Sequence, residues 1–271
     1  MQRCQIRTGF VCLLAAVLAL PADSAEPVRA QQGMVVAQEP IAADVGLAVL
    51  KQGGNAVDAA VAVGFALAVT HPVAGNLGGG GFMLVRQANG ATDFLDFRES
   101  APGKASRDMY IGPDGTPTRD SLFGWRSSGV PGSVAGFEAA HKKFGSKPWR
   151  ELLAPAIKLA RDGFEVTEPF AASLRGAETL KSDPESNRVF LRYGDPYKAG
   201  EIFKQPDLAN TLERISSHGA EGFYEGETAA QIAAAMAKHG GLITAQDLKS
   251  YKVAERAPLT GDYKSFHIIT A

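Results

Sequence analysis

The spacing of apolar residues predicts a helix-rich second half of the chain. After residue 130, apolar positions recur at intervals of three and four, which is the period of an amphipathic helix. This pattern predicts four helices, at residues 132–144, 149–161, 207–218 and 227–239. Residues 178–206 are rich in Pro, Gly, Asp and Lys and are expected to form surface loops. A short helix reaching Tyr251 is expected after Thr244, because Thr244 followed by Asp247 resembles a capping box.

Two further helices are predicted near the start of the chain. The first covers residues 40–50, with proline at its start and Gly53-Gly54 beyond its end. The second covers residues 56–69, is capped by Asn55 and is apolar except for Asp58 and one glycine. A helix that is apolar all round is expected to be buried on every side. Asp58 lies in the first turn, where a carboxylate faces the positive end of the helix dipole, so a structural role is preferred to a catalytic one.

The remaining apolar runs have the pattern of antiparallel strands. Runs at residues 82–85 and 93–98 flank the turn signal at 88–90, which predicts a hairpin. A second antiparallel pair is expected at residues 258–263 and 266–271. With helices packed on largely antiparallel sheet, the predicted fold class is α+β.

The first 24 residues have the composition of an export signal. Two arginines precede an apolar run at residues 10–20, and small residues follow it. This run is too short to cross a bilayer, which needs about 20 apolar residues. We therefore expect residues 1–24 to be a signal peptide, cleaved after Ala22 or Ser24, and the remaining chain to be exported to the periplasm or the extracellular space.

Composition narrows the class of protein further. The chain has 271 residues, a net charge of −1 and 45% hydrophobic residues, enough for a hydrophobic core without a disulfide or a metal. A charged fraction of 21% excludes a disordered polyelectrolyte, and the absence of a long apolar run excludes a membrane-spanning protein. The near-neutral charge argues against a nucleic-acid partner. Both cysteines, Cys4 and Cys12, lie in the signal segment, so the exported chain has no disulfide, thiolate metal site or cysteine nucleophile.

A glycine-rich loop at residues 75–81 could bind an anion or serve close packing. A phosphate-binding loop lies between a strand and the N-terminus of a helix, so that backbone N–H groups point at the anion. Here the order is reversed, because a helix precedes the glycines and a strand follows them. Nucleotide binding is therefore disfavoured. Two interpretations remain: a close backbone approach under a sheet edge, or amides that line a substrate pocket.

Arg98 is the strongest candidate for a binding residue. It closes an apolar strand and is followed by Glu99. An arginine at the mouth of a sheet can bind a carboxylate through two parallel hydrogen bonds. A solvated arginine, or one paired with Asp96 or Glu99, is the commoner arrangement at a strand end, so both interpretations stay open.

The polar residues show no familiar metal or serine-nucleophile motif. The five histidines lack the His-x-x-x-His and His-Glu-x-x-His spacings, and no Gly-x-Ser-x-Gly sequence occurs. His218 and His239 precede glycines at helix ends, where an imidazole complements the dipole. His71, next to Pro72, has the least common setting and is expected to be structural. The residues imply neither a metal nor a cofactor.

Several segments spread over most of the chain match the motifs of one enzyme family. The most specific are GNLGGGGFM at residues 75–83 and FRESAP at residues 97–102. Further matching segments lie at residues 33–37, 53–62, 70–72, 129–132, 159–164, 240–244 and 247–248. From residue 33 to residue 271 the chain resembles γ-glutamyltranspeptidase, a family also called glutathione hydrolase, some relatives of which are cephalosporin acylases.

The resemblance implies an N-terminal-nucleophile hydrolase with an αββα sandwich, made as a proenzyme that cleaves itself. The new N-terminal threonine attacks a γ-glutamyl amide such as glutathione, with its own α-amine as the base. The γ-glutamyl group then passes to water or to an amino-acid or peptide acceptor. The resemblance further implies that Arg98 binds the substrate α-carboxylate and that Glu99 orients Arg98 or the neighbouring loop.

The resemblance also implies that part of the family pattern lies outside this chain. The family nucleophile follows a Thr-Thr-His sequence, whereas the single Thr-His here, Thr70-His71, belongs to the glycine-loop motif. Residues 25–271 are thus expected to be a large-subunit region truncated before the nucleophile. The sandwich would then be incomplete, the chain would contain no catalytic residue, and its partner would be the small, catalytic subunit. Exposed sheet edges are expected near residues 266–271.

Two other functions stay open at this point. One is a cephalosporin-acylase-like member of the same superfamily, which would cleave β-lactam side chains. The other is a stand-alone periplasmic module that binds carboxylates and has no catalytic activity.

Overall fold

The structure is a computed structural model that describes residues 26–271. The described residues divide into two units, residues 26–34 and Val35–Ala271. Within the first unit, residues 26–34 are exposed and contain no helix or strand. The predicted signal peptide, residues 1–24, lies outside the described residues. Every element named below belongs to the second unit.

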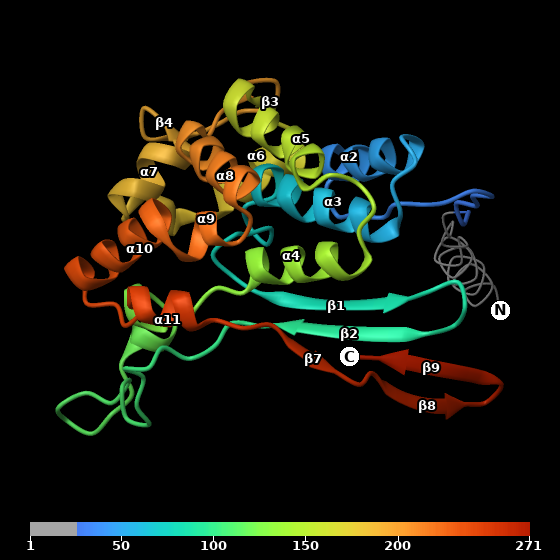
Figure 1. Ribbon diagram of the computed structural model, residues 1–271. Helices are drawn as coiled ribbons and strands as arrows, with labels where there is room; N and C mark the ends of the chain where they lie inside the picture. The colour runs from blue at the N-terminus through green and yellow to red at the C-terminus, as the bar shows by residue number, and fades with distance from the viewer. Residues whose placement is uncertain (1–25) are drawn as a thin grey trace, which may run out of the picture. The chain divides into compact units, whose positions relative to one another are not determined.

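A three-stranded antiparallel sheet carries the strand that precedes Arg98 (Figure 1). β1 (Gly81–Arg86) and β2 (Thr92–Phe97) form the predicted hairpin. β7 (Ala254–Arg256) pairs with the other side of β2, so β2 is the central strand. β7 was not predicted, because three residues are too few to show an alternating pattern.

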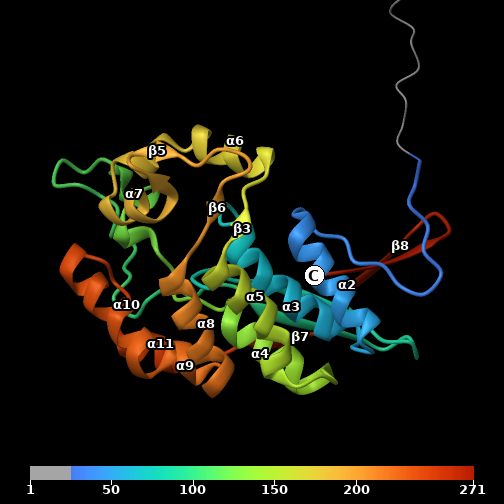
Figure 2. The ribbon, with the colours of Figure 1, turned by 90° about the horizontal axis from the view of Figure 1, so that it is seen from above.

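Helices cover one face of this sheet (Figures 1 and 2). α4 (Ser133–Phe144) lies directly against β1 and β2. α3 (Ala56–Thr70) packs on α4, and α2 (Pro40–Lys51) and α5 (Trp149–Asp162) pack on α3. α3 is therefore surrounded by other elements, as its almost wholly apolar sequence predicts.

Aromatic rings connect these layers. Phe97 at the end of β2 contacts Phe137 of α4, which contacts Phe65 of α3, which in turn contacts Trp149 of α5. Their ring centroids lie 5.8, 5.1 and 5.4 Å apart in that order, each pair close to edge-on. Edge-to-face pairs at such distances add stability beyond the burial of apolar area. The strand that leads to Arg98 is thus anchored in the core by its last residue.

The remaining helices lie in the second half of the chain. They are α6 (Glu168–Gly176), α7 (Pro184–Phe190), α8 (Pro206–His218), α9 (Glu221–Tyr224), α10 (Gly226–His239) and α11 (Ala245–Ser250), with 3₁₀ turns at Arg119–Ser121, Trp125–Ser127 and Glu178–Lys181. For each helix and strand that was predicted, the first and the last residue lie within one position of those observed. α6, α7 and α9 were not predicted. The fold is α+β, as expected, and among residues 26–271 no helix is long and apolar enough to cross a membrane.

The prediction of surface loops for residues 178–206 is wrong in part. This segment contains α7 and the short strands β4 (Leu191–Arg192), β5 (Asp195–Pro196) and β6 (Ile202–Phe203). Phe203 is fully buried, and its ring lies 5.8 Å from Phe164 and 5.3 Å from Phe170. β6 pairs with β3 (Phe164–Glu165). The aromatic residues here are too widely spaced to show a period, and residues distant in sequence bury them.

Asp58 connects α3 to the turn between α4 and α5. Asn55 caps α3, and the Asp58 carboxylate accepts the backbone N–H of Asn55 at 2.8 Å, which completes a capping box. The fully buried carboxylate also accepts the N–H and the hydroxyl of Ser146 at 2.9 and 2.6 Å, and the N–H of Lys147 at 3.2 Å. Burial raises the pKa of Asp58, but these hydrogen bonds outweigh it and hold the pKa below 3.8. The preferred structural role is confirmed.

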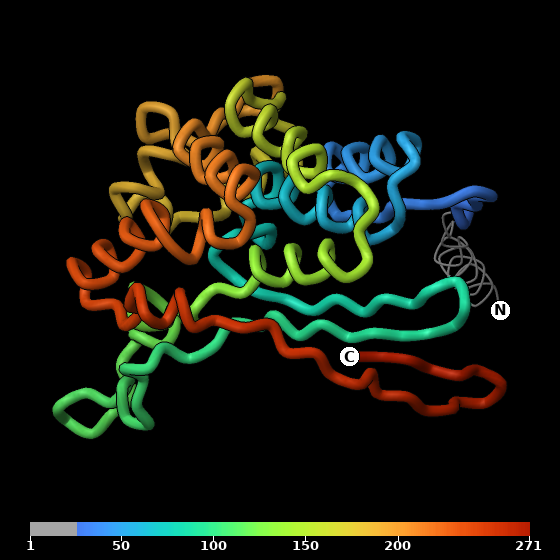
Figure 3. The backbone as a smooth tube through the Cα atoms, in the orientation of Figure 1, coloured from blue at the N-terminus to red at the C-terminus, as the bar shows by residue number. Residues whose placement is uncertain are grey.

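The second predicted hairpin forms a separate two-stranded sheet (Figure 3). It consists of β8 (Leu259–Tyr263) and β9 (Phe266–Thr270). Its large apolar side chains are mostly exposed, among them Leu259, Tyr263, Phe266 and Ile268. Within the described residues β9 pairs only with β8, so its other edge is unpaired, as expected for a sheet edge near residues 266–271.

Candidate functional site

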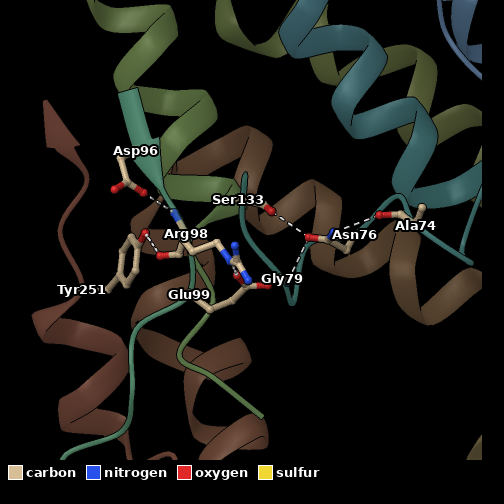
Figure 4. Close-up of polar contacts among 8 residues, drawn as sticks. All are labelled: Ala74, Asn76, Gly79, Asp96, Arg98, Glu99, Ser133 and Tyr251. Carbon is tan, nitrogen blue, oxygen red and sulfur yellow. Dashed lines mark hydrogen bonds and ion pairs between the residues drawn. The ribbon is translucent and has the colours of Figure 1, made fainter. Parts of the chain in front are cut away.

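The candidate site lies where β2 ends and the chain leaves the sheet. Phe97 is buried, whereas the side chain of Arg98, the next residue, is 68% exposed. Arg98 Nε lies 3.2 Å from Glu99 Oε2, and the two side chains point toward one another beside the glycine loop (Figure 4). The ion pair between Arg98 and Glu99, which was one of the possibilities left open by the sequence, is therefore present. Within residues 26–271, Nη1 and Nη2 of Arg98 have no hydrogen-bond partner, so both remain available to an anion.

Arg98 and Glu99 line a pocket of about 360 Å³. Residues 100–102 and 126–129 form much of the rest of its wall. Arg126 also lines this pocket, and its Nη1 lies 3.4 Å from Asp120, which is not among the lining residues. Arg126 was not predicted, because it lies in a loop with no recognisable pattern. A pocket bordered by Arg98, with a second arginine in its wall, is suited to a ligand that carries a carboxylate.

Two side chains hold the backbone of Arg98. Asp96 Oδ1 accepts the N–H of Arg98 at 3.1 Å, and the hydroxyl of Tyr251 donates to the carbonyl oxygen of Arg98 at 2.8 Å (Figure 4). Hydrogen bonds from Arg256 and from the N–H of Arg98 lower the pKa of Asp96. Burial, followed by the charges of Asp96 and Glu99, raises the pKa of Tyr251 to about 12. Tyr251 therefore stays protonated, and able to donate, throughout the neutral range.

The glycine loop serves close packing next to this site. Asn76 Oδ1 accepts the N–H of Gly79 at 2.9 Å and the hydroxyl of Ser133 at 2.7 Å, and Asn76 Nδ2 donates to Ala74 O at 3.0 Å (Figure 4). The carbonyl oxygen of Gly79 accepts the N–H groups of Gly132 and Ser133, which start α4. The close-approach interpretation is confirmed. Part of the loop, at Gly78, also lines a second, largely apolar pocket of about 410 Å³.

At Gly80 the backbone of the glycine loop packs tightly against the end of β2. A Cβ at Gly80 would lie 2.6 Å from Phe97 O and 2.7 Å from Glu99 N, both backbone atoms of the strand end. Gly80→Ala is therefore expected to lower the free energy of unfolding by about 1–3 kcal/mol, as overpacking does. Denaturant unfolding would measure this change.

The neighbouring Gly78→Ala is the matched control. A Cβ at Gly78 meets no atom within 4 Å. An equal loss of stability in both variants would show that the cost comes from the glycine backbone in general and not from the contact with β2.

The other residues considered from the sequence lie apart from this site. Asp58 lies in the first turn of α3 and binds the turn after α4. His71 lines a different pocket of about 660 Å³, and its buried Nε2 has no partner among residues 26–271. Within the same residues, no group of three or more His, Cys, Asp or Glu side chains is arranged to hold a metal ion.

The chain is similar to known proteins over nearly its whole length. The family profile described as Gamma-glutamyltranspeptidase matches residues 42–271. The glutathione hydrolase proenzyme of Escherichia coli (strain K12) is 51% identical over 249 residues, which is 91% of this chain and 43% of that protein. The glutathione hydrolase proenzyme of Pseudomonas sp. (strain A14) is 46% identical, over 98% of this chain and 46% of that protein. The chain thus spans less than half the length of these relatives.

Solved structures agree with this similarity. The γ-glutamyltranspeptidase of Helicobacter pylori has a TM-score of 0.88 and 44% identity, over 90% of this chain and 71% of that one. The cephalosporin acylase of Bacillus halodurans is more distant, with a TM-score of 0.80 and 30% identity, over 93% and 49% of the two chains. The helical layer on an antiparallel sheet is accordingly part of an αββα sandwich of the N-terminal-nucleophile hydrolase type. The chain belongs to the γ-glutamyltranspeptidase family.

Proposed function

We propose that this chain is the large-subunit region of an exported γ-glutamyltransferase and glutathione hydrolase. Its substrates are glutathione and other γ-glutamyl compounds, and the acceptors are water, amino acids or peptides. Residues 1–24 act as the signal peptide, residues 25–271 belong to the enzyme domain, and a small subunit completes the site. Membership of the family supports this proposal.

The observation that most directly supports the proposal is the hydrogen bonding of the Arg98 guanidinium. Its Nε is paired with Glu99, while Nη1 and Nη2 face no partner and the side chain borders an open pocket. A guanidinium in this state can donate two parallel hydrogen bonds to a carboxylate. The α-carboxylate of a γ-glutamyl donor provides that anion. Glu99 restricts the rotation of the guanidinium.

In the proposed reaction this chain binds the donor and does not supply the nucleophile. A threonine hydroxyl of the small subunit attacks the γ-carbonyl carbon, its proton passes to the leaving amine, and the C–N bond breaks. The product of this step is a γ-glutamyl ester. Water or an acceptor amine then attacks the ester carbonyl, and the threonine oxygen regains a proton. By holding the α-carboxylate, Arg98 fixes where the reacting γ-carbonyl lies relative to the threonine hydroxyl.

The test compares two donors with the full-length protein. Hydrolysis of a γ-glutamyl anilide and of glutaryl-cephalosporin is followed under the same conditions. The proposal expects the γ-glutamyl anilide to be cleaved with the higher kcat/KM. It also expects free amino acids to raise the rate of anilide release through transfer.

A cephalosporin-acylase activity is the second candidate, because the acylase of Bacillus halodurans shares the fold at 30% identity. Faster cleavage of glutaryl-cephalosporin would favour it and contradict the first proposal. The discriminating group is the α-amino group of the donor, because a glutaryl chain keeps the terminal carboxylate and lacks only this amine.

A further inference from the structure

Arg98 lies just beyond the end of β2, where the strand ladder no longer holds it. The last β1–β2 pair joins Gly81 to Phe97, and the last β2–β7 pair joins Asp96 to Ala254. The backbone polar groups of Arg98 are instead taken by side chains. Asp96 accepts its N–H, and Tyr251, which is 153 residues away in sequence, donates to its carbonyl oxygen.

Asp96 is itself held by a residue of β7, the strand next to β2. Its Oδ2 accepts the Nε of Arg256 on β7 at 2.7 Å, while its Oδ1 accepts the N–H of Arg98. The Asp96 side chain is only 17% exposed, and each of its two oxygens accepts one of these hydrogen bonds. Both the strand pairing and this ion pair therefore connect β7 to the Arg98 backbone.

Tyr251 is fixed by its surroundings as well. It directly follows α11, and its ring stacks on Tyr224 with centroids 5.8 Å apart and an angle of 9° between the planes. A Cβ at Gly132 would overlap both the Tyr251 hydroxyl and the carbonyl oxygen of Phe97. The Tyr251 hydroxyl is therefore tightly packed next to the end of β2.

These contacts bear on how Arg98 meets an anion. Most of the Arg98 side chain is exposed, so few packing contacts restrict it. The direction of its guanidinium then depends on where the backbone places its Cβ, on the side-chain torsions, on the ion pair with Glu99 and on the Phe82 ring, whose centroid lies 6.0 Å from Arg98 Cζ. A small rotation of the backbone at Cα displaces the guanidinium by a larger distance, because the guanidinium lies at the end of a long side chain. A displaced guanidinium no longer donates well to both oxygens of a carboxylate.

We propose that Asp96 and Tyr251 are positioning residues that orient Arg98 for recognition of the donor α-carboxylate. This inference rests on the function proposed above. The two side chains touch no substrate, and they act through the backbone of Arg98. Their effect is therefore confined to donors that Arg98 recognises.

The test measures KM and kcat for the γ-glutamyl anilide in the full-length protein. Tyr251→Phe keeps the ring and its stacking and removes only the hydroxyl, so KM is expected to rise about three- to tenfold while kcat changes less than twofold. Asp96→Ala is expected to raise KM by a similar factor. Asp96→Asn, which keeps an oxygen acceptor, is expected to restore most of the loss.

A double-mutant cycle separates positioning from general stability. In an Arg98→Ala background, Tyr251→Phe is expected to have no further effect on KM, because the residue through which it acts is gone. Tyr193→Phe is the matched control, since the Tyr193 residue is 97% exposed and the chemical change is the same. This control is expected to behave like the wild type.

The outcomes separate this inference from the function on which it rests. An inactive wild type would overturn both. An active wild type that is impaired by Arg98→Ala supports the function. If Tyr251→Phe and Asp96→Ala then leave KM unchanged, or raise it equally with and without Arg98, the positioning role is overturned and the proposed function stands.

Discussion

Arg98→Ala is expected to lower kcat/KM for a γ-glutamyl donor by about 10- to 150-fold in the full-length protein. The lost carboxylate contact corresponds to about 1.5–3 kcal/mol of charge-assisted hydrogen bonding. The side chain is largely exposed and leaves no cavity, so the free energy of unfolding is expected to change by less than about 0.5 kcal/mol. Steady-state kinetics and a denaturant melt measure the two effects separately.

Two variants serve as references for Arg98→Ala. Arg98→Lys keeps the charge but loses the bidentate fork, and it should fall between the wild type and the alanine variant. Arg86→Ala removes another exposed strand-end arginine, at the end of β1, and should leave kcat/KM unchanged. Wild-type kinetics for Arg98→Ala, or an equal loss for Arg86→Ala, would contradict the role proposed for Arg98.

Asp58→Ala is expected to lower the free energy of unfolding by about 3–4 kcal/mol. The substitution leaves three backbone N–H groups, of Asn55, Ser146 and Lys147, without their acceptor in a partly buried place. Asp44→Ala, at an exposed position of the adjacent helix α2, should change stability by less than about 0.5 kcal/mol. Urea unfolding at pH 7 measures both variants.

The contribution of Asp58 also depends on pH in a known direction. Its pKa in the folded state lies below the value of 3.8 in the unfolded chain. The unfolded state therefore binds the proton more readily, and the contribution is complete above pH 3.8 and is lost as pH falls through the folded-state pKa. The stability gap between the wild type and Asp58→Asn should shrink over this acid range. A gap that grows on acidification would contradict the assignment.

Local chemistry made much of the fold predictable. Asn55 caps α3 and Thr244 caps α11 through contacts with residues two or three positions away, so the sequence contains both partners. The hairpin of β1 and β2 was predictable because its turn is equally local. The family motifs identified Arg98 and Glu99 as candidates for the same reason, since FRESAP is a contiguous run.

Two of the features that were missed depend on distant partners. β7 is a strand only because it pairs with β2, some 160 residues earlier. Phe203 is a core residue because Phe164 and Phe170 surround it. Neither residue type nor local spacing reveals such a partner, because burial is a property of the packed layers.

The sequence by itself determined seven of the helices and both hairpins, the family motifs that the chain carries and the arginine that is the candidate for binding a carboxylate. Only the tertiary structure decided how that arginine is held. Asp96 takes its backbone N–H, Tyr251 takes its carbonyl oxygen, and Gly80 and Gly132 let the loop and α4 approach the strand end. The physical reason is that hydrogen bonds and close contacts depend on distances of a few ångströms, and residues far apart in sequence reach those distances only when helices and sheet pack together.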